Sequence, residues 1–192
     1  MKRIAIFASG SGSNAQKIIE YFAEAENTEI SLVLSNNENA FVLERASSLN
    51  IPAYVFDRKL FYETDQVHDI LRDIGIDFIV LAGFMWLVPQ NILSHWSGRI
   101  VNIHPALLPK FGGKGMYGDK VHKAVIDAGE KETGITIHYV NEKYDEGKII
   151  FQEAFEILPK DTPESIAEKI HVLEHKHFPA VIGQLVDKLD QE

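Results

Sequence analysis

Two polar side chains, Asn102 and His104, stand at the end of an otherwise apolar segment that runs from Ile100. They are two residues apart, so on an extended strand both side chains point to the same face. Pro105 follows at once and cannot donate a hydrogen bond to a sheet, which predicts that the strand stops there. An amide can hydrogen-bond a developing oxyanion, and an imidazole can move a proton near neutral pH. The pair fits acyl transfer, and the alternative is that both side chains only fix the turn.

A glycine-serine loop, Ser-Gly-Ser-Gly-Ser-Asn at residues 9–14, joins an apolar run at 4–8 to an amphipathic stretch at 14–25. This order predicts a buried strand, a tight loop and a helix amino terminus. Free backbone amides beside small side chains form an anion site there, and phosphate is the expected ligand. The loop lacks the Lys of a P-loop, and Ala15 replaces the third Gly of the dinucleotide fingerprint. A turn that binds no ligand is the alternative.

Two more segments could complete a site. The apolar strand expected at residues 78–82 continues into Gly-Phe-Met-Trp-Leu-Val at 83–88. An apolar loop at the carboxyl end of a strand is where an open α/β sheet binds a flat ligand, with core packing as the alternative. The polar turn at 141–147 carries Asp145, which beside His104 would orient the imidazole and raise its pKa. An ordinary solvated turn carboxylate is the alternative for Asp145.

Strands and helices alternate along most of the chain. This alternation predicts an α/β fold with a doubly wound, mostly parallel sheet and ligands bound across the carboxyl ends of the strands. The alternating residues 133–140 and the strand at 149–155 indicate antiparallel strands in the carboxyl-terminal half. Phe41 is expected to face inward, and the glycine-rich residues 110–120 are expected to form a mobile segment over the site. The other strands are expected at residues 4–8, 29–34, 51–56, 78–82 and 99–104, and the helices at 14–25, 40–49, 65–74, 89–95, 121–128 and 163–189.

Composition narrows the possible partners. Of the 192 residues, 28 are acidic and 19 are basic, which gives a formal net charge of -9. This charge argues against a broad nucleic-acid surface or an anionic membrane as partner, and an anionic ligand would need a local basic or dipolar pocket. Cysteine is absent, which excludes disulfides, a thiolate nucleophile and a cysteine-type zinc site. The chain fits a reducing compartment, so the cytoplasm is the expected location.

Motifs along nearly the whole chain resemble those of the phosphoribosylglycinamide formyltransferases, which are folate-dependent enzymes of purine synthesis in the wider formyltransferase/hydrolase family. They are the loop at 9–14, Leu-Ala-Gly-Phe-Met at 81–85, Asn-Ile-His-Pro-Ala-Leu-Leu-Pro at 102–109, residues 134–140 and Tyr-Asp-Glu-Gly at 144–147. The resemblance implies a Rossmann-like formyltransferase fold in a single domain over residues 1–192. Residues 1–100 would form its phosphate-binding half, and residues 101–192 its catalytic and folate-binding half.

The resemblance also implies a reaction and its residues. The formyl group of 10-formyltetrahydrofolate, as co-substrate, would pass to the amine of 5'-phosphoribosylglycinamide in de novo IMP synthesis, through a tetrahedral intermediate and without a metal. Asn102, His104 and Asp145 take the catalytic positions. The acceptor substrate would contact Gly12, Ser13, Asn14, Pro109, Lys110 and Glu174, and the folate would contact Met85, Trp86, Leu87, Val88, Val140, Asn141, Tyr144 and Asp145. Trp86 and Thr64 stand where many members have Arg, and Arg58 is the nearest cation.

Other functions are alternatives to this one. Another formyltetrahydrofolate-using transferase or hydrolase is the nearest, although a hydrolase would carry an amino-terminal regulatory domain and methionyl-tRNA formyltransferase a basic carboxyl-terminal domain. A dinucleotide-binding oxidoreductase would need an acidic residue after its second strand, where Ser35 and Asn36 stand. A nucleotide-binding sensor domain would not need the Asn102, His104 and Asp145 set. The expected partners are small-molecule substrates, without nucleic acid or membrane, and the protein is expected to be a monomer or a homodimer.

Overall fold

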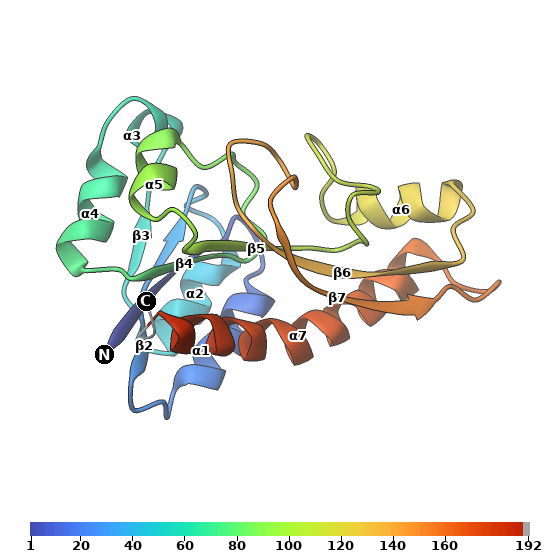
Figure 1. Ribbon diagram of the computed structural model, residues 1–192, viewed down its shortest axis with the longest axis horizontal. Helices are drawn as coiled ribbons and strands as arrows, with labels where there is room; N and C mark the ends of the chain where they lie inside the picture. Colours follow the sequence, from blue (N-terminus) through green and yellow to red (C-terminus); the bar gives the residue numbers. More distant parts are fainter. Residues whose placement is uncertain (190–192) are drawn as a thin grey trace.

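A computed structural model describes residues 1–189, so the last three residues of the domain expected over 1–192 lie outside the described part (Figure 1). Within it, seven strands form one sheet in the order β3-β2-β1-β4-β5-β6-β7. The first five are parallel, and β6 and β7 are added antiparallel at one edge. The expected mostly parallel sheet with antiparallel strands is confirmed. The strands are β1 Lys2–Phe7, β2 Thr28–Ser35, β3 Ala53–Val55, β4 Phe78–Leu81, β5 Ile100–His104, β6 Glu132–Tyr139 and β7 Ile149–Glu156.

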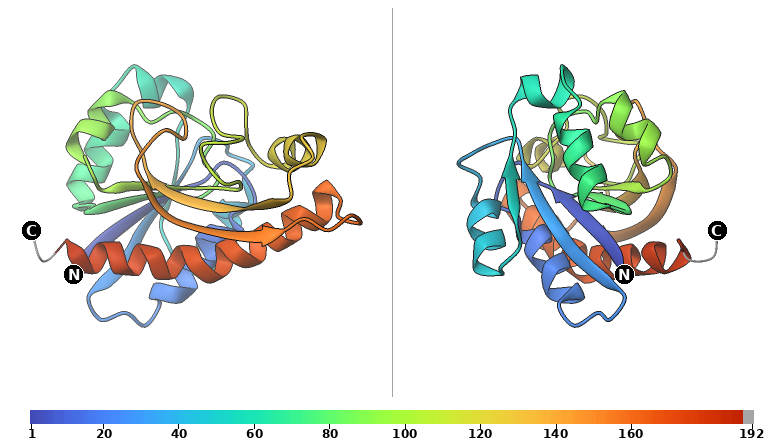
Figure 2. Two further views of the ribbon diagram at one scale, coloured as in Figure 1. Left: turned by 45° about the vertical axis from the view of Figure 1, so that its right-hand side comes forward. Right: turned by 90° about the vertical axis from the view of Figure 1, so that its left-hand side faces the viewer.

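Helices cover both faces of the sheet (Figure 2). α1, α2 and α7 pack on one face, and α3, α4 and α5 pack on the other. α6 lies against α7 beyond the parallel strands. Among the described residues the helices are α1 Ser13–Phe22, α2 Phe41–Ser48, α3 Arg58–Tyr62, α4 Gln66–Ile74, α5 Gln90–His95, α6 Asp119–Asp127 and α7 Pro163–Lys188. None of them combines the length and apolarity needed to cross a membrane.

Successive residues of β1 supply both cores. Ile4 and Ile6 join the cluster under α1 and α7, whereas Ala5 and Phe7 join the cluster under α3, α4 and α5. Side chains of a strand alternate between the faces of a sheet, so a strand covered on both faces must be apolar throughout. This requirement explains the uninterrupted apolar run at the start of the chain.

α7 crosses one face of the sheet, where it supplies both residues of the hydrophobic core and the buried polar residue Glu174. Its amino terminus is capped, because the Thr162 side chain accepts a hydrogen bond from the Ser165 amide and Pro163 occupies the first turn. The Ser165 hydroxyl accepts from the Thr162 amide at 3.0 Å, which completes a reciprocal capping pair. Glu174 faces the protein from the middle of this helix and is buried.

Two expectations about the helices were wrong or incomplete. Phe41 is 47% exposed, because α2 buries Val42 and Ala46 instead and the Arg45 guanidinium lies 4.8 Å from the Phe41 ring centre. The short helix α3 was not expected. It has only five residues, too few for a helical repeat to be visible, and begins where the Asp57 side chain accepts a hydrogen bond from the Leu60 amide.

The turn between β6 and β7 is packed tightly against the end of β6. A Cβ atom at Gly147 would overlap the carbonyl oxygen of Tyr139, and the Tyr139 amide donates to the Lys148 carbonyl at 2.9 Å. Asp145, in the same turn, has a left-handed backbone with φ 56°. The absence of a side chain at Gly147 therefore decides where the turn holds Asp145.

We expect Gly147→Ala to lower the free energy of unfolding by about 1–3 kcal/mol, because backbone must move to admit the methyl group. Thermal unfolding followed by circular dichroism measures this loss. Gly183→Ala is the matched control, since the atoms nearest its Cβ would belong to the Tyr21 side chain, at 3.4 Å, and alanine favours a helix interior. A parent-like melting curve for Gly147→Ala would contradict the close packing of the turn.

Candidate active site

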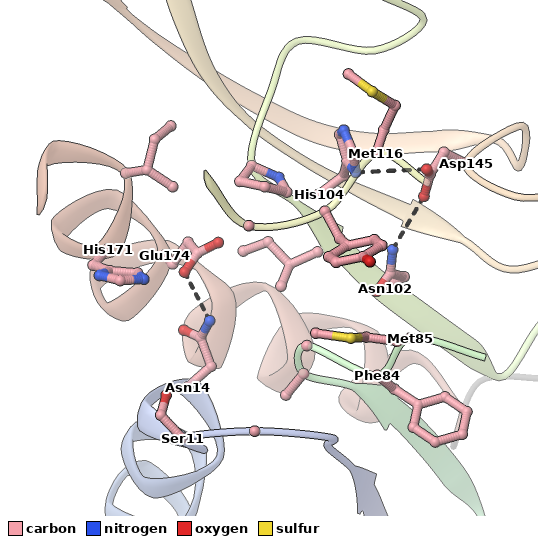
Figure 3. A pocket seen from close by; sticks show the side chains of 18 of the residues that line it. Ser11, Asn14, Phe84, Met85, Asn102, His104, Met116, Asp145, His171 and Glu174 are labelled. Carbon is pink, nitrogen blue, oxygen red and sulfur yellow. Dashed lines mark hydrogen bonds and ion pairs between the residues drawn. The ribbon is translucent and has the colours of Figure 1, made fainter. Parts of the chain in front are cut away.

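A cavity of about 490 Å³ opens at the carboxyl ends of β1, β4 and β5 (Figure 3). Its walls come from the loop before α1, the loop after β4, the end of β5, the glycine-rich loop after Pro109, the β6–β7 turn and α7. These segments are distant in sequence and meet because the carboxyl ends of parallel strands share one edge. The residues that line the cavity include Gly12, Ser13, Asn14, Met85, Asn102, His104, Tyr144, Asp145 and Glu174.

The loop before α1 has the geometry of an anion site. Gly12 adopts a left-handed conformation with φ 73°, and a Cβ atom there would overlap the Val42 side chain, so both the turn and the packing require glycine. The first amides of a helix have no acceptor within it, and those of α1 begin at Ser13 on the cavity wall. Arg45 supports the loop from outside by donating to the Ser11 carbonyl at 2.8 Å.

Asn14, which is half-buried, and Glu174, which is buried, form a polar pair on the same wall. The Asn14 amide donates to Glu174 Oε2 at 2.8 Å, and Asn14 Oδ1 is buried without a partner among the described residues. Burial raises the pKa of the Glu174 carboxyl to about 7, and the hydrogen bond from Asn14 offsets only part of that rise. A buried polar atom without a partner is costly. The pair is therefore suited to a ligand hydroxyl, which can donate to one residue and accept from the other.

The two ring nitrogens of His104 have different neighbours, and these decide which nitrogen carries the hydrogen. His104 is 3% exposed, and its Nε2 lies 2.8 Å from the Phe111 carbonyl oxygen. A carbonyl only accepts, so Nε2 carries the hydrogen and Nδ1 holds the lone pair of the neutral ring. Nδ1 lies 3.6 Å from Asp145 Oδ2. His104 can therefore take up a proton at Nδ1, next to a carboxylate that stabilises the resulting imidazolium.

The expectation that the pKa of His104 is raised was wrong. Burial lowers the pKa of this imidazole below its ordinary value, and the opposing effects of Asp145 and the Phe111 carbonyl do not cancel that change. Asp145 is also buried, but hydrogen bonding with His138, the charge of His104 and the Gly113 amide together lower the pKa of its carboxyl. The pair consequently rests as a neutral imidazole beside a carboxylate.

His138 holds the Asn102 amide and was missed by sequence reasoning. Its Nδ1 donates to the Tyr139 carbonyl at 2.9 Å, so Nε2 is free to accept from Asn102 Nδ2 at 3.1 Å. The second hydrogen of that amide faces Asp145 Oδ1 at 3.5 Å, a weak contact that a ligand oxygen could replace. The alternating pattern of residues 133–140 revealed a strand, but only its pairing register places His138 opposite Asn102.

A second, smaller cleft of about 50 Å³ adjoins Asn102 and Asp145. The two cavities share Phe84, Asn102, Tyr144 and Asp145, so they meet at the catalytic candidates. The walls of the cleft are mostly apolar, as a flat heterocycle requires. They include Leu81, Phe84, Trp86, Leu87, Val88 and Val140. Within the part of the chain that the structure describes, no group of three or more His, Cys, Asp or Glu residues is placed to hold a metal ion.

Comparison with known proteins shows the family of this chain. Residues 2–182 match the family described as formyl transferase. The chain belongs to the formyl transferase family. It is 42% identical over 193 residues to the chloroplastic phosphoribosylglycinamide formyltransferase of Arabidopsis thaliana, covering 97% of this chain and 66% of that protein. It is 41% identical over 192 residues to the phosphoribosylglycinamide formyltransferase of Bacillus subtilis (strain 168), covering 97% of this chain and 95% of that protein.

Another relative and a solved structure are also similar to this chain. The trifunctional purine biosynthetic protein adenosine-3 of Drosophila melanogaster is 40% identical over 194 residues. The match covers 97% of this chain but only 14% of that much longer protein. The crystal structure of phosphoribosylglycinamide formyltransferase from Bacillus Halodurans superposes with a TM-score of 0.88 at 41% identity, covering 98% of this chain and 97% of that one. The resemblance inferred from the motifs is confirmed.

Not every expected contact residue of this formyl transferase reaches a cavity. Pro109, Lys110 and Asn141 line neither one. Lys110 instead pairs with Glu130 at 2.9 Å, and the Asn141 side chain accepts from the Lys143 amide at 3.0 Å. Met85 lines the larger cavity, whereas Trp86, Leu87, Val88 and Val140 line the smaller cleft, and Asn14 and Glu174 contact one another in the larger one.

Two histidines in the cavity wall were also missed. His122 and His171 both line the larger cavity, and Figure 3 shows His171 beside Glu174. His171 precedes Glu174 by three residues on α7, so both lie on one helix face. The spacing of three residues could therefore have indicated from the sequence that His171 lies beside Glu174. His122 offered no such sequence signal. It lies on α6, and the course of the glycine-rich loop before α6 determines that its side chain lines the cavity.

We expect the pKa of His104, measured by NMR titration of its ring, to lie below the ordinary histidine value and to fall further in Asp145→Asn. The carboxylate attracts the imidazolium, so its loss makes protonation harder. Asp73→Asn removes the same charge from an exposed site on α4 and should leave this pKa unchanged. A rise in the pKa of His104 in Asp145→Asn would show that the carboxylate does not face the ring.

Proposed function

We propose that this formyl transferase moves the formyl group of 10-formyltetrahydrofolate to the amine of 5'-phosphoribosylglycinamide, a step of de novo IMP synthesis. One observation carries the proposal: Asn102, His104 and Asp145 lie where the larger cavity, which includes the anion loop, meets a smaller and mostly apolar cleft. The first suits a phosphorylated sugar and the second a flat pterin ring. The names of the relatives agree with this pair of substrates.

In this proposal the acceptor substrate lies along the larger cavity. Its phosphate accepts hydrogen bonds from backbone amides at Gly12, Ser13 and Asn14, where the helix dipole favours an anion. Its ribose hydroxyls meet the Asn14 side chain and Glu174, which have a spare acceptor and a carboxyl of raised pKa. These contacts direct the glycinamide amine toward His104. Binding by backbone dipoles lets a chain with a net charge of -9 hold a phosphate.

The amine then attacks the formyl carbon, and a C–N bond forms as the carbonyl electrons move to oxygen. The resulting tetrahedral intermediate carries an oxyanion, which the second Asn102 hydrogen binds in place of Asp145. His104 Nδ1 takes the proton from the attacking nitrogen, since burial keeps this imidazole neutral beforehand, and Asp145 stabilises the cation. The same proton passes to the folate nitrogen as its C–N bond breaks. No net proton is gained or lost.

Two other uses of the site remain as alternatives for experiment. A hydrolase would direct water at the formyl carbon, and a nucleotide-binding sensor would bind the phosphorylated ligand without turnover. The pair of Asn14 and Glu174 favours a sugar-containing acceptor over water, because it lies on the cavity wall and Asn14 Oδ1 is buried without a hydrogen-bond partner among the described residues. Absence of cysteine fits a reducing compartment, so we also propose the cytoplasm as location and small molecules as partners.

Mixing the protein with 10-formyltetrahydrofolate and 5'-phosphoribosylglycinamide should produce the formylated acceptor, detected by mass spectrometry, together with tetrahydrofolate in equal amount. His104→Ala is the control and should lose nearly all turnover. Release of formate without an acceptor would establish a hydrolase. Ligand binding without either product, by a protein with a native circular dichroism spectrum, would establish a sensor.

We expect Ser13→Asp to raise the KM for 5'-phosphoribosylglycinamide at least about 10-fold, because the added carboxylate repels a phosphate at the helix amino terminus. The KM for the formyl donor should change little. Ser47→Asp adds the same charge on an exposed position of α2 that lines neither cavity. Steady-state kinetics with each substrate varied in turn decides the matter, and an acceptor KM equal in both variants would exclude the loop from phosphate binding.

A further inference from the structure

Helix α2 holds the loop before α1 from outside the larger cavity. None of residues 41–48, which form this helix, lines the cavity wall. The Val42 amide donates to the Gly10 carbonyl at 3.1 Å, and one step along the loop Arg45 Nε donates to the Ser11 carbonyl at 2.8 Å. Helix α2 therefore fixes the direction of two successive carbonyl groups of the loop.

The direction of a carbonyl group decides where the next amide points. A peptide unit is planar and trans, so its C=O and the N–H of the following residue point in opposite directions. The Ser11 carbonyl faces Arg45, and this turns the Gly12 amide to the other side of the loop, where Gly12 lines the larger cavity. Within residues 1–189 the Gly12 amide donates no hydrogen bond. It is therefore a donor that an anion in the cavity can use.

Three contacts fix the Arg45 guanidinium. Beside its bond to the Ser11 carbonyl, Nη1 donates to Gln16 Oε1, and the Phe41 ring centre lies 4.8 Å from Cζ. Gln16 belongs to α1, so the guanidinium joins two helices across the loop. A planar fork stacked on a ring keeps one orientation, which gives the exposed Phe41 a purpose. Among the described residues no carboxylate pairs with Arg45, so its charge stays available behind an anion loop.

We propose that Arg45 is a positioning residue for the acceptor phosphate: its hydrogen bond to the Ser11 carbonyl keeps the Gly12 amide directed into the larger cavity. The inference rests on the proposed function, because it takes a phosphorylated acceptor as the ligand of the loop. Without this bond the peptide unit between Ser11 and Gly12 can rotate, since glycine tolerates either sign of φ. Its carbonyl oxygen then faces the phosphate and repels it. Arg45 does not line the cavity, so it acts through the loop.

The kinetic test compares acceptors with and without the phosphate. Arg45→Met keeps a long side chain on α2 and should raise the KM for 5'-phosphoribosylglycinamide about 10-fold, the size of one lost charge-assisted hydrogen bond, with kcat unchanged. The kcat/KM for ribosylglycinamide, which lacks the phosphate, should stay at the parent value. Arg72→Met removes the same charge from an exposed position on α4 that lines neither cavity and should change neither acceptor. An equal effect on both acceptors, or on neither, would overturn the assignment.

A binding measurement separates this inference from the proposed reaction. Titration with ribose 5-phosphate, followed by amide NMR spectra, needs neither formyl donor nor turnover. The Gly12 amide signal should shift in the parent protein, and in Arg45→Met this shift should be lost while the Ser13 signal still responds. If the shift is lost in this way and the parent does not formylate 5'-phosphoribosylglycinamide, the Arg45 assignment stands and the acceptor is wrong.

The opposite result is equally distinct. A Gly12 shift that persists in Arg45→Met, or that is absent from the parent, would overturn the role of Arg45 even if 5'-phosphoribosylglycinamide is formylated. The spectra of the unliganded variant also report its fold, since an unfolded protein loses the dispersion of its amide signals.

Discussion

The antiparallel pairing of β6 with β5 is the constraint on which the candidate site depends. Its register places His138 opposite Asn102 and Thr136 opposite His104. His138 then holds the Asn102 amide, and the Thr136 hydroxyl bonds two backbone groups of the loop that leaves β5. The same strand ends at the turn that carries Asp145. One strand pairing therefore sets the relative positions of the reactive groups and the course of the loops around them.

Within this frame, the number of hydrogen bonds decides which buried acid is charged. Asp145 interacts with His104 and His138 and accepts from a backbone amide, and its pKa is lowered despite burial. Glu174 accepts from Asn14 alone, and burial raises its pKa to about 7. The imidazole of His104 has one backbone partner and one carboxylate neighbour, and burial still lowers its pKa. Desolvation therefore prevails except where several donors converge on one carboxylate.

Features that depend on local pattern were predictable from the sequence. The apolar runs gave the strands, the glycine-serine loop gave the turn into α1, and the two-residue spacing put Asn102 and His104 on one face. Features that depend on tertiary proximity were not. His138 needed the β5–β6 register, and the direction of the His104 pKa needed the depth of burial. Phe41 shows the same limit for packing. The way α2 lies on the sheet buries Val42 and leaves Phe41 exposed, and the sequence of α2 alone does not determine this orientation.

The loop before α1 and the helix α3 differ in how visible each is in the sequence. Backbone amides of residues 9–14 can converge on an anion only where glycine permits the turn, so the sequence of the loop itself carries the signal. Helix α3 has only five residues and is held by one hydrogen bond from Tyr62 to the loop after β4, and neither feature leaves a pattern in the sequence. The β5–β6 pairing fixes the candidate catalytic residues within the sheet, so the segments that the sequence describes least well lie outside it.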